Sequence, residues 1–417
     1  MQKLWVYADF DWLKEIELIG TLSYDKLRGS DSYGFEFHAN WLRNHASIQI
    51  SEDINNYPGA QYTQPGKEIF GCFSDVLPDR WGRTLINKRE QILALEEKRP
   101  LRNLSSFDYL IGIDDFSRMG GFRFKWDLEG DYLNKSSSFN VPPITDLRTL
   151  IRASQEIERS DIQLVLPDKK WIVQLFQPGT SLGGARPKAS VSDEYRKLYI
   201  AKFPSINDTY DVGLWEQLCN ILAEEAGINT APSKVIDVGG KYHTYLSERF
   251  DRSPANKRIH FASAMTLLGF EDGDNATTGK GYPDIVDFIV RDCTDVNSNL
   301  EELYRRVAFN IYVGNSDDHF RNHGFLLTPK GWTLSPVYDV NPTLDDHQSL
   351  LISSTSNEAN PDILLDASEE YLIDRKRADQ ILHQVRSSLK NWEKVAKRLR
   401  IPEQELSIFR FRFNKHL

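Results

Sequence analysis

The 417 residues correspond to two or three domains at roughly 150 residues per domain. A content of 40% hydrophobic and 12% aromatic residues excludes a chain that is disordered throughout, because such chains lack the apolar surface for a core. The formal net charge of −9 argues against a dedicated nucleic-acid-binding protein, which usually has a high pI, and leaves only a local basic face open.

Cysteine usage and the first residues indicate a protein of the cytoplasm. Cys72, Cys219 and Cys293 lie far apart without a CxxC pair, so neither a complete disulfide set nor a zinc site is predicted. The opening residues lack the basic and apolar regions of a signal peptide, and no stretch reaches about 18 successive apolar residues. We therefore expect a cytoplasmic localisation and no contact with a membrane.

Residues 1 to about 125 predict short strands and turns. Residues 33–39 alternate ring and polar side chains, which is typical of a strand. The turn-rich residues 75–83 lead into a helix predicted after Arg83. Residues 128–146 are polar, contain a Lys-Ser-Ser-Ser run and indicate a linker or long loop.

The next part, to about residue 255, mixes both kinds of element. A helix is predicted from about Val212 to Ala226, where apolar residues form one stripe and Gly227 stands at the position of a C-cap glycine. Strands are predicted at 189–191, 197–203, 235–238 and 242–246, strand content at 164–176, and a helix at 146–158.

From about residue 260 onward the pattern is mainly helical. Ser298 and Glu301 have the spacing of a capping box, and the apolar residues from Leu300 to Ile311 follow the 3.6-residue period. Apolar positions from Ile381 to Leu399 predict one long amphipathic helix.

The densest polar cluster, residues 315–322, directly follows this apolar helix. Asp317, Asn322 five residues on, and Asp339 in an apolar run suit phosphoryl transfer, in which one carboxylate orients a hydroxyl and the other two side chains hold Mg²⁺. Each signal alone has an ordinary alternative: Asp317, Asp318 and His319 as a solvated turn, and Asp339 as a structural carboxylate.

Two further features fit a nucleotide site. The Gly-rich residues 179–188 offer backbone N–H groups to phosphates, although the loop is not a Walker A motif. Lys202 lies in an apolar strand, with Glu216 on the next helix as its predicted partner. A flexible loop and an outward-facing Lys beside an outward-facing Glu are the alternatives.

The order of these parts is that of a protein-kinase-like phosphotransferase, although HRD and DFG triplets are missing. The sequence resembles the HipA family of bacterial serine/threonine kinases, the toxins of type II toxin–antitoxin modules. The resemblance rests on residues 73–83, 181–189, 248–252, 315–322 and 338–340. It implies an α+β, protein-kinase-like two-lobed fold with an added β-rich N-terminal subdomain (1–125), a nucleotide-binding N-lobe (126–255) and a helical catalytic C-lobe (256–417).

The resemblance also implies roles for individual residues. Asp317 would be the catalytic base, supported by His319. Asn322 and Asp339 would hold Mg²⁺, and Ser181 would be the site of inhibitory autophosphorylation. The residues implied in ATP binding are Lys202, Glu248, Phe250, Ser181, Gly183, Gly184, Lys188 and Tyr338, with Glu216 as the partner of Lys202.

The implied function is that of an ATP- and Mg²⁺-dependent protein serine/threonine kinase, the toxin of a toxin–antitoxin pair. Its implied partners are a HipB-like helix-turn-helix antitoxin, a protein substrate such as an aminoacyl-tRNA synthetase, and operator DNA only within the antitoxin complex. A catalytically silent, nucleotide-binding corepressor and a small-molecule kinase stay open as alternatives.

Overall fold

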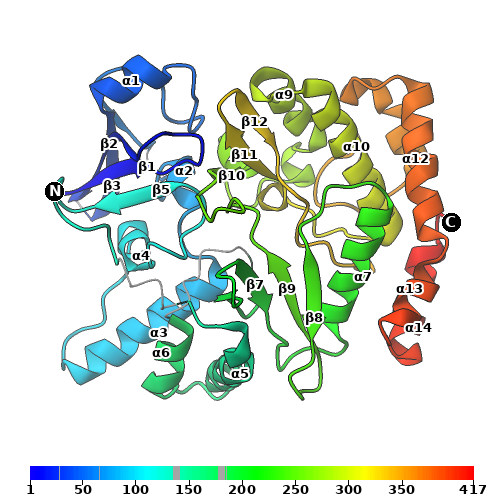
Figure 1. Cartoon of the computed structure of the whole chain (residues 1–417), viewed down its shortest axis with the longest axis horizontal. Coiled ribbons are helices and arrows are strands. Elements are labelled where there is room, and N and C mark those ends of the chain that lie inside the picture. Colours follow the sequence, from blue (N-terminus) through cyan, green and yellow to red (C-terminus); the bar gives the residue numbers. More distant parts are fainter. Residues whose placement is uncertain (28, 65, 135–140, 177–183, 185) are drawn as a thin grey trace. The chain divides into compact units, whose positions relative to one another are not determined.

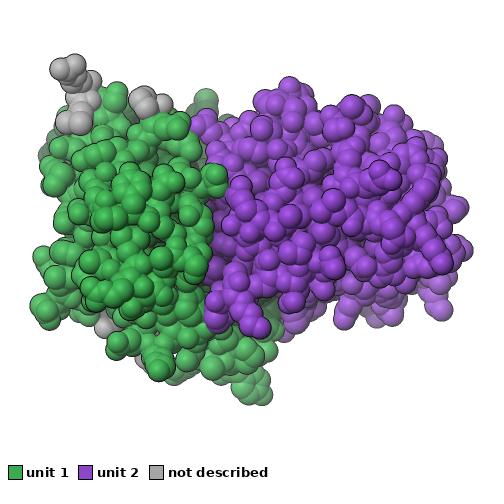
Figure 2. All heavy atoms as spheres, turned by 90° about the horizontal axis from the view of Figure 1, so that it is seen from above, with its two compact units in different colours: residues 1–207, 248–262 green, residues 208–247, 263–417 purple. Residues whose placement is uncertain are grey.

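The computed structural model describes residues 1–417 except 28, 65, 135–140, 177–183 and 185. It contains two compact units, coloured separately in Figure 2: unit 1 holds residues 1–207 and 248–262, and unit 2 holds residues 208–247 and 263–417. The chain therefore passes from one unit to the other three times. The boundaries predicted near residues 125 and 255 stay a prediction.

Unit 1 begins with an antiparallel sheet in the order β4-β3-β2-β1-β5. Strands β1, β2, β3 and β5 are labelled in Figure 1. Its strands are β1 (Gln2–Ala8), β2 (Glu17–Leu27), β3 (Ser30–Phe37), β4 (Ala60–Tyr62) and β5 (Phe122–Lys125). Strand β3 confirms the strand predicted from alternation, because Tyr33, Phe35 and Phe37 are all buried on one face. Phe73 completes this aromatic core, with its ring 5.7 Å from those of Phe35 and Phe122.

The rest of unit 1 is mostly helical. It contains α1 (Ala39–His45), α2 (Gly71–Ser74), α3 (Arg80–Glu96), α4 (Ser106–Gly112), η1 (Ile144–Asp146), α5 (Leu147–Ile162), α6 (Lys169–Phe176), β6 (Lys188–Ser192) and β7 (Leu198–Lys202). Helix α3 begins at Arg80, before the predicted start, because the Asp79 carboxylate caps it by accepting the Gly82 N–H at 2.7 Å. The predicted strand content at 164–176 is wrong, since α6 occupies its second half.

Unit 2 carries the hairpins β8 (Ser233–Ile236)–β9 (Thr244–Glu248) and β11 (Gly324–Thr328)–β12 (Gly331–Leu334). Its helices are α7 (Val212–Glu225), α8 (Ala264–Leu267), η2 (Ala276–Thr278), α9 (Tyr282–Asp292), α10 (Val296–Val313), η3 (Phe320–Asn322), α11 (Pro361–Asp366), η4 (Ser368–Tyr371), α12 (Arg375–Leu389), α13 (Trp392–Arg398) and α14 (Glu403–Asn414). The short strand β10 (Phe261–Ser263) lies where the chain re-enters this unit.

Two helix predictions in unit 2 need correction and one is confirmed. Helix α10 begins at Val296 after Asp295, so the capping box predicted at 298–301 is wrong. The long helix predicted up to Leu399 is divided into α12 and α13. Helix α7 is confirmed, and Gly227 follows it with a left-handed φ of +79°. No helix in the described part of the chain is long and apolar enough to cross a membrane.

Candidate functional site

The loop that carries Asp317 starts where α10 ends in unit 2. Gly314 ends the helix with φ +77°, a left-handed conformation that favours glycine. Asn315 then turns back onto the helix: its backbone N–H donates to the Asn310 carbonyl at 2.9 Å, and its side chain donates to the Asn310 amide oxygen at 3.1 Å. The next two residues therefore leave the helix end in a fixed direction.

Asp318 anchors this loop to the core of unit 2. It is buried, and its carboxylate accepts hydrogen bonds from the Tyr282 hydroxyl, from Asn310 Nδ2 at 2.7 Å and from His323 Nε2 at 3.0 Å. Burial opposes the charge, but His323 and the Tyr282 hydrogen bond outweigh it and lower the pKa of Asp318 below its usual value. Asp318 is thus structural, and the solvated turn considered for it is excluded by its burial.

Asp317, the neighbouring residue, is exposed. Its backbone carbonyl accepts a hydrogen bond from the side-chain Nδ2 of Asn322 at 3.0 Å, and the Asn322 N–H donates to the His319 carbonyl at 2.8 Å. Nδ1 of His319 is buried and has no hydrogen-bond partner in the part of the chain that is described. The structure therefore joins Asp317, His319 and Asn322 in one tight loop, which ends in η3.

Tyr338 ties the segment with Asp339 to the same loop. Its hydroxyl donates to the Arg321 carbonyl at 2.6 Å. Asp339 has a left-handed φ of +58° and its Oδ1 accepts from Asn341 Nδ2 at 3.4 Å, so it lies in an irregular segment after β12 and not in a strand. The apolar run around Asp339 predicted a strand-like segment, but in the structure Asp339 lies in irregular backbone.

The donor atoms near this loop fit Mg²⁺. Because Asn322 uses its side-chain nitrogen on the Asp317 carbonyl, its oxygen is the atom left for a ligand. Magnesium takes oxygen ligands, and in phosphoryl-transfer sites it keeps one or two protein side chains plus substrate phosphates. Asn322 and Asp339 supply an amide oxygen and a carboxylate of that kind. Among the described residues, no three or more His, Cys, Asp or Glu gather as a metal site.

Unit 1 brings the two predicted phosphate lysines together. Lys188 on β6 and Lys202 on β7 are direct cross-strand partners. Two like charges in that position repel each other unless one is neutralised. The Lys188 ammonium forms an ion pair with Asp79 at 3.1 Å, and both side chains are buried.

Gly184, near the end of the glycine-rich loop, lies beside Lys188 and the first turn of α3, which Asp79 caps. Gly184 has φ +85°, its carbonyl accepts the Trp81 N–H at 3.4 Å, and a Cβ on it would lie 3.0 Å from Lys188 Nζ. A glycine therefore suits this position for both conformation and space. Ser181 and Gly183 lie outside the described residues.

The predicted hinge, residues 248–252, is built around buried charges. The Glu248 carboxylate faces outward and pairs with Lys197 at 3.2 Å, and the Arg249 N–H donates to the Leu198 carbonyl at 2.8 Å. Asp251 is fully buried and binds Arg249 at 2.7 Å. Phe250 stands between them in sequence, with its ring 5.9 Å from that of Phe261. No motif in the sequence indicated this ion cluster, because its further hydrogen-bond partners come from residues 116–120.

Glu216, the predicted partner of Lys202, lies in unit 2. It is buried on α7, one residue after Trp215. The helix is capped by Asp211, whose carboxylate accepts the Leu214 N–H at 3.1 Å. The pairing of Glu216 with Lys202 stays a prediction.

Comparison with known protein families and solved structures shows to which family the chain belongs. It matches the family model of the HipA N-terminal domain over residues 12–106 and that of the HipA-like C-terminal domain over residues 180–392. The chain belongs to the HipA family. The resemblance predicted from the motifs is thereby confirmed.

A HipA sequence and a HipA structure, both of Shewanella oneidensis, illustrate the relationship. The chain is 26% identical over 246 residues to the serine/threonine-protein kinase toxin HipA, a match that spans 52% of this chain and 55%, about half, of that relative. It also matches a chain of the solved complex of HipA, HipB and operator DNA, with a TM-score of 0.69, 18% identity and coverage of 99% of this chain and 95% of that chain. The shared HipA fold confirms the predicted kinase-like α+β fold.

Gly314, at the start of the loop that carries Asp317, offers a test of local strain. A Cβ there would meet the left-handed φ and would lie 2.6 Å from Arg412 Cγ, whereas a Cβ on Gly227, with nearly the same φ, would meet no described atom within 4 Å. We expect Gly227→Ala to lower the free energy of unfolding by about 1 kcal/mol. Gly314→Ala should lower it by about 2–4 kcal/mol, because overpacking adds to the strain. Urea titration of both variants checks this, and equal losses would contradict it.

Proposed function

We propose that this chain is an ATP-dependent protein serine/threonine kinase of HipA type and the toxin of a toxin–antitoxin pair. The observation that carries the proposal is the contrast between two adjacent carboxylates. Asp318 is buried and held by three donors, and it fixes the loop, while the neighbouring Asp317 in the same loop is exposed. An exposed carboxylate on a rigid support suits a group that orients a substrate hydroxyl.

The remaining residues have supporting roles in the proposal. ATP and Mg²⁺ supply the phosphoryl group and the positive charge that stabilises it during transfer. Asn322 and Asp339 would hold the metal through oxygen atoms. Lys188 and Lys202 would neutralise phosphate charge, which requires Lys188 to exchange its partner Asp79 for the nucleotide. The backbone of Glu248 and Phe250 would meet the adenine, and Tyr338 would keep its place beside Arg321.

The partner in this proposal is a HipB-like antitoxin that binds operator DNA. The support is the solved relative of Shewanella oneidensis, in which HipA is in complex with HipB and operator DNA. We further propose that phosphorylation of Ser181 switches the kinase off, because a phosphoserine would add negative charge to the segment proposed to bind the ATP phosphates.

The test is the intact mass of the phosphatase-treated chain after incubation with Mg²⁺ and ATP, with a parallel sample in EDTA. A gain of one phosphate at Ser181 that requires Mg²⁺ supports the kinase and its proposed switch. If the chain binds ATP but neither the chain nor an added protein substrate gains a phosphate, the result would favour the silent corepressor. Absence of ATP binding would contradict both.

A further inference from the structure

The C-terminal helix α14 carries two ionisable side chains on its buried face (red end of the chain in Figure 1). Glu405 and Arg412 are seven residues, or about two turns, apart and both are buried. Leu406, Phe409 and Phe413 make up the rest of this face. Buried charges on a helix call for specific partners, because an unpaired charge in a core is costly.

The first half of α14 holds the start of α7. The Glu405 carboxylate accepts the Asp211 N–H at 3.2 Å and the Trp215 Nε1–H at 3.0 Å. The Phe409 ring packs against Trp215 with a centroid distance of 4.5 Å. These contacts give α14 a fixed position in unit 2.

The second half of α14 meets the base of the loop that carries Asp317. The Arg412 side chain fills the space beside Gly314, so close that a Cβ on that glycine would overlap its Nε atom. Its Nη1 donates to the Asp346 carboxylate at 2.8 Å. Nε and Nη2 are buried without a hydrogen-bond partner in the described part of the chain. Burying two guanidinium nitrogens without a hydrogen bond costs free energy, so the role of Arg412 calls for an explanation.

Both contacts of Arg412 lead to the backbone before Asp317. The Gly314 carbonyl accepts the Thr343 N–H at 2.8 Å, and the Ser316 carbonyl accepts the Ser349 N–H at 3.0 Å. Asp346 lies between Thr343 and Ser349 in the chain. Arg412 therefore packs against Gly314. Together with Lys415, whose Nζ binds the same Asp346 oxygen at 2.7 Å, it also holds by charge the segment that hydrogen-bonds to Gly314 and Ser316.

We propose that Arg412 is a positioning residue for Asp317, which acts through Gly314 and Asp346 and touches no reacting group itself. Helix α14 lies beyond residues 180–392, the range matched by the family model of the C-terminal domain. The proposal rests on the proposed kinase function as far as its kinetic part is concerned. Its structural part, control of the mobility of residues 314–323, is independent of that function.

The test compares full-length wild type with Arg412→Met, Arg412→Lys and Arg410→Met. Arg410 is the matched control, because it lies two residues away on the outer side of α14 and pairs with Glu393 and Glu403. Arg412→Met is expected to lower kcat for phosphotransfer about 10- to 100-fold, since a small misplacement of a catalytic group has effects of this size. KM for ATP should stay within about twofold of wild type, because a positioning defect acts on the chemical step.

Hydrogen exchange supplies the second readout. Amides of residues 314–323 should exchange at least about tenfold faster in Arg412→Met, whereas those of β11 and β12 should keep their protection. Arg412→Lys should restore much of the loss, because it can still reach Asp346, and Arg410→Met should match wild type.

Unchanged exchange at residues 314–323 in Arg412→Met would overturn the proposal whether or not the protein is a kinase. Unchanged kcat in a folded Arg412→Met would overturn it as well. A wild type without phosphotransfer would instead contradict the proposed function, and the exchange data would still decide the role of Arg412.

Discussion

Asp317→Asn is expected to lower the rate of phosphotransfer about 1,000-fold, which is the contribution typical of a catalytic base. The amide keeps the size of the carboxylate but cannot take a proton from a substrate hydroxyl. Because the Asp317 side chain is exposed, the free energy of unfolding should change by less than about 0.5 kcal/mol. Single-turnover transfer from Mg-ATP, the dissociation constant for ATP and a urea titration measure the three effects separately.

Asp318→Asn is the matched comparison, because it makes the same change one residue along the chain. All three of its donors bind one carboxylate oxygen, Oδ2, so an asparagine can place its amide oxygen there, but each hydrogen bond then goes to a neutral acceptor. This variant should lose about 3 kcal/mol of stability, because each of the three hydrogen bonds to a charged acceptor contributes about 1 kcal/mol more than one to a neutral acceptor. A catalytic base contributes at least about 100-fold to the rate. A folded Asp317→Asn that retains more than about a tenth of the wild-type rate would therefore show that Asp317 is not the base.

Local patterns predicted the elements in which one face is buried along the whole length. Strand β3 and helix α7 follow this rule, with periods of two and 3.6 residues. The rule failed at residues 164–166, which are apolar yet largely exposed, since Leu164 is 92% exposed. The strand predicted at 164–176 was wrong because these exposed apolar residues were assigned to a buried strand.

The division between α12 and α13 was invisible in the sequence for a different reason. Leu389, Trp392 and Ala396 are all buried and keep helical spacing across the break. The turn between the two helices consists of Lys390 and Asn391, so no Gly or Pro in the sequence indicates the break. An amphipathic pattern reports which residues face the core, but it does not report whether the helix axis continues.

The candidate site was predictable to the extent that it is local. The spacing from Asp317 to Asn322 located the loop, because both lie within one turn of the backbone joined by a hydrogen bond. The different fates of Asp317 and Asp318 were not predictable, since they depend on Tyr282, which is 36 residues away from Asp318. The contact of Arg412 with Gly314 is equally remote in sequence.

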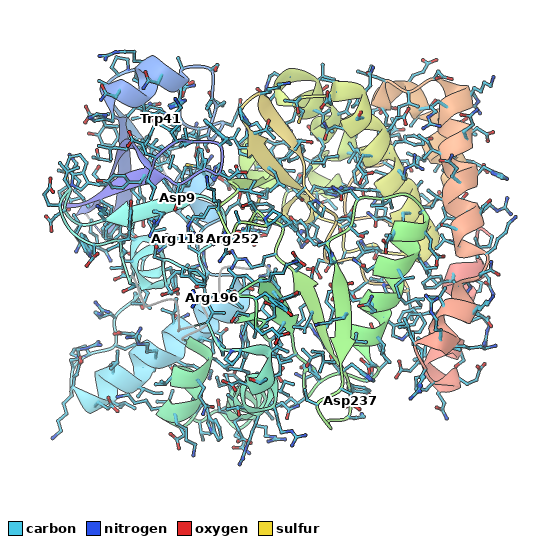
Figure 3. All side chains as sticks on the ribbon, in the orientation of Figure 1. Asp9, Trp41, Arg118, Arg196, Asp237 and Arg252 are labelled. Carbon is cyan, nitrogen blue, oxygen red and sulfur yellow. The ribbon has the colours of Figure 1, made fainter. Side chains whose placement is uncertain are left out.

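The ion cluster around Asp251 in unit 1 is the clearest case of such remote contacts. Asp251 accepts hydrogen bonds from Arg249 Nη2 at 2.7 Å, from Arg252 Nη1 at 2.6 Å and from the Gly120 N–H at 2.8 Å. Arg252 also donates to the Arg118 carbonyl at 2.9 Å, and Arg118 and Arg252 are labelled in Figure 3. One carboxylate thus balances two buried guanidinium groups and ties the predicted hinge to residues 116–120.

Asp251→Ala is therefore expected to lower the free energy of unfolding of unit 1 by about 3–5 kcal/mol, because it leaves two buried arginines without a counter-charge. Asp127→Ala is the matched control on an exposed position of the same unit, and it should change stability by less than about 0.5 kcal/mol. Urea unfolding followed by hydrogen exchange of unit 1 amides measures both. A loss below about 1 kcal/mol for Asp251→Ala would mean that the cluster contributes no more than a surface ion pair.

The same carboxylate predicts a dependence on pH. Burial opposes the charge of Asp251, but Arg249 and Arg252 outweigh it and lower the pKa below its usual value. A group with a lowered folded-state pKa stabilises the fold above its unfolded pKa of about 3.9, and this contribution is lost as the pH falls toward the folded value. The wild type should therefore lose stability below about pH 4 more steeply than Asp251→Asn, which has no proton to bind at this position. Parallel acid titrations of the two proteins would contradict this assignment if their slopes were equal.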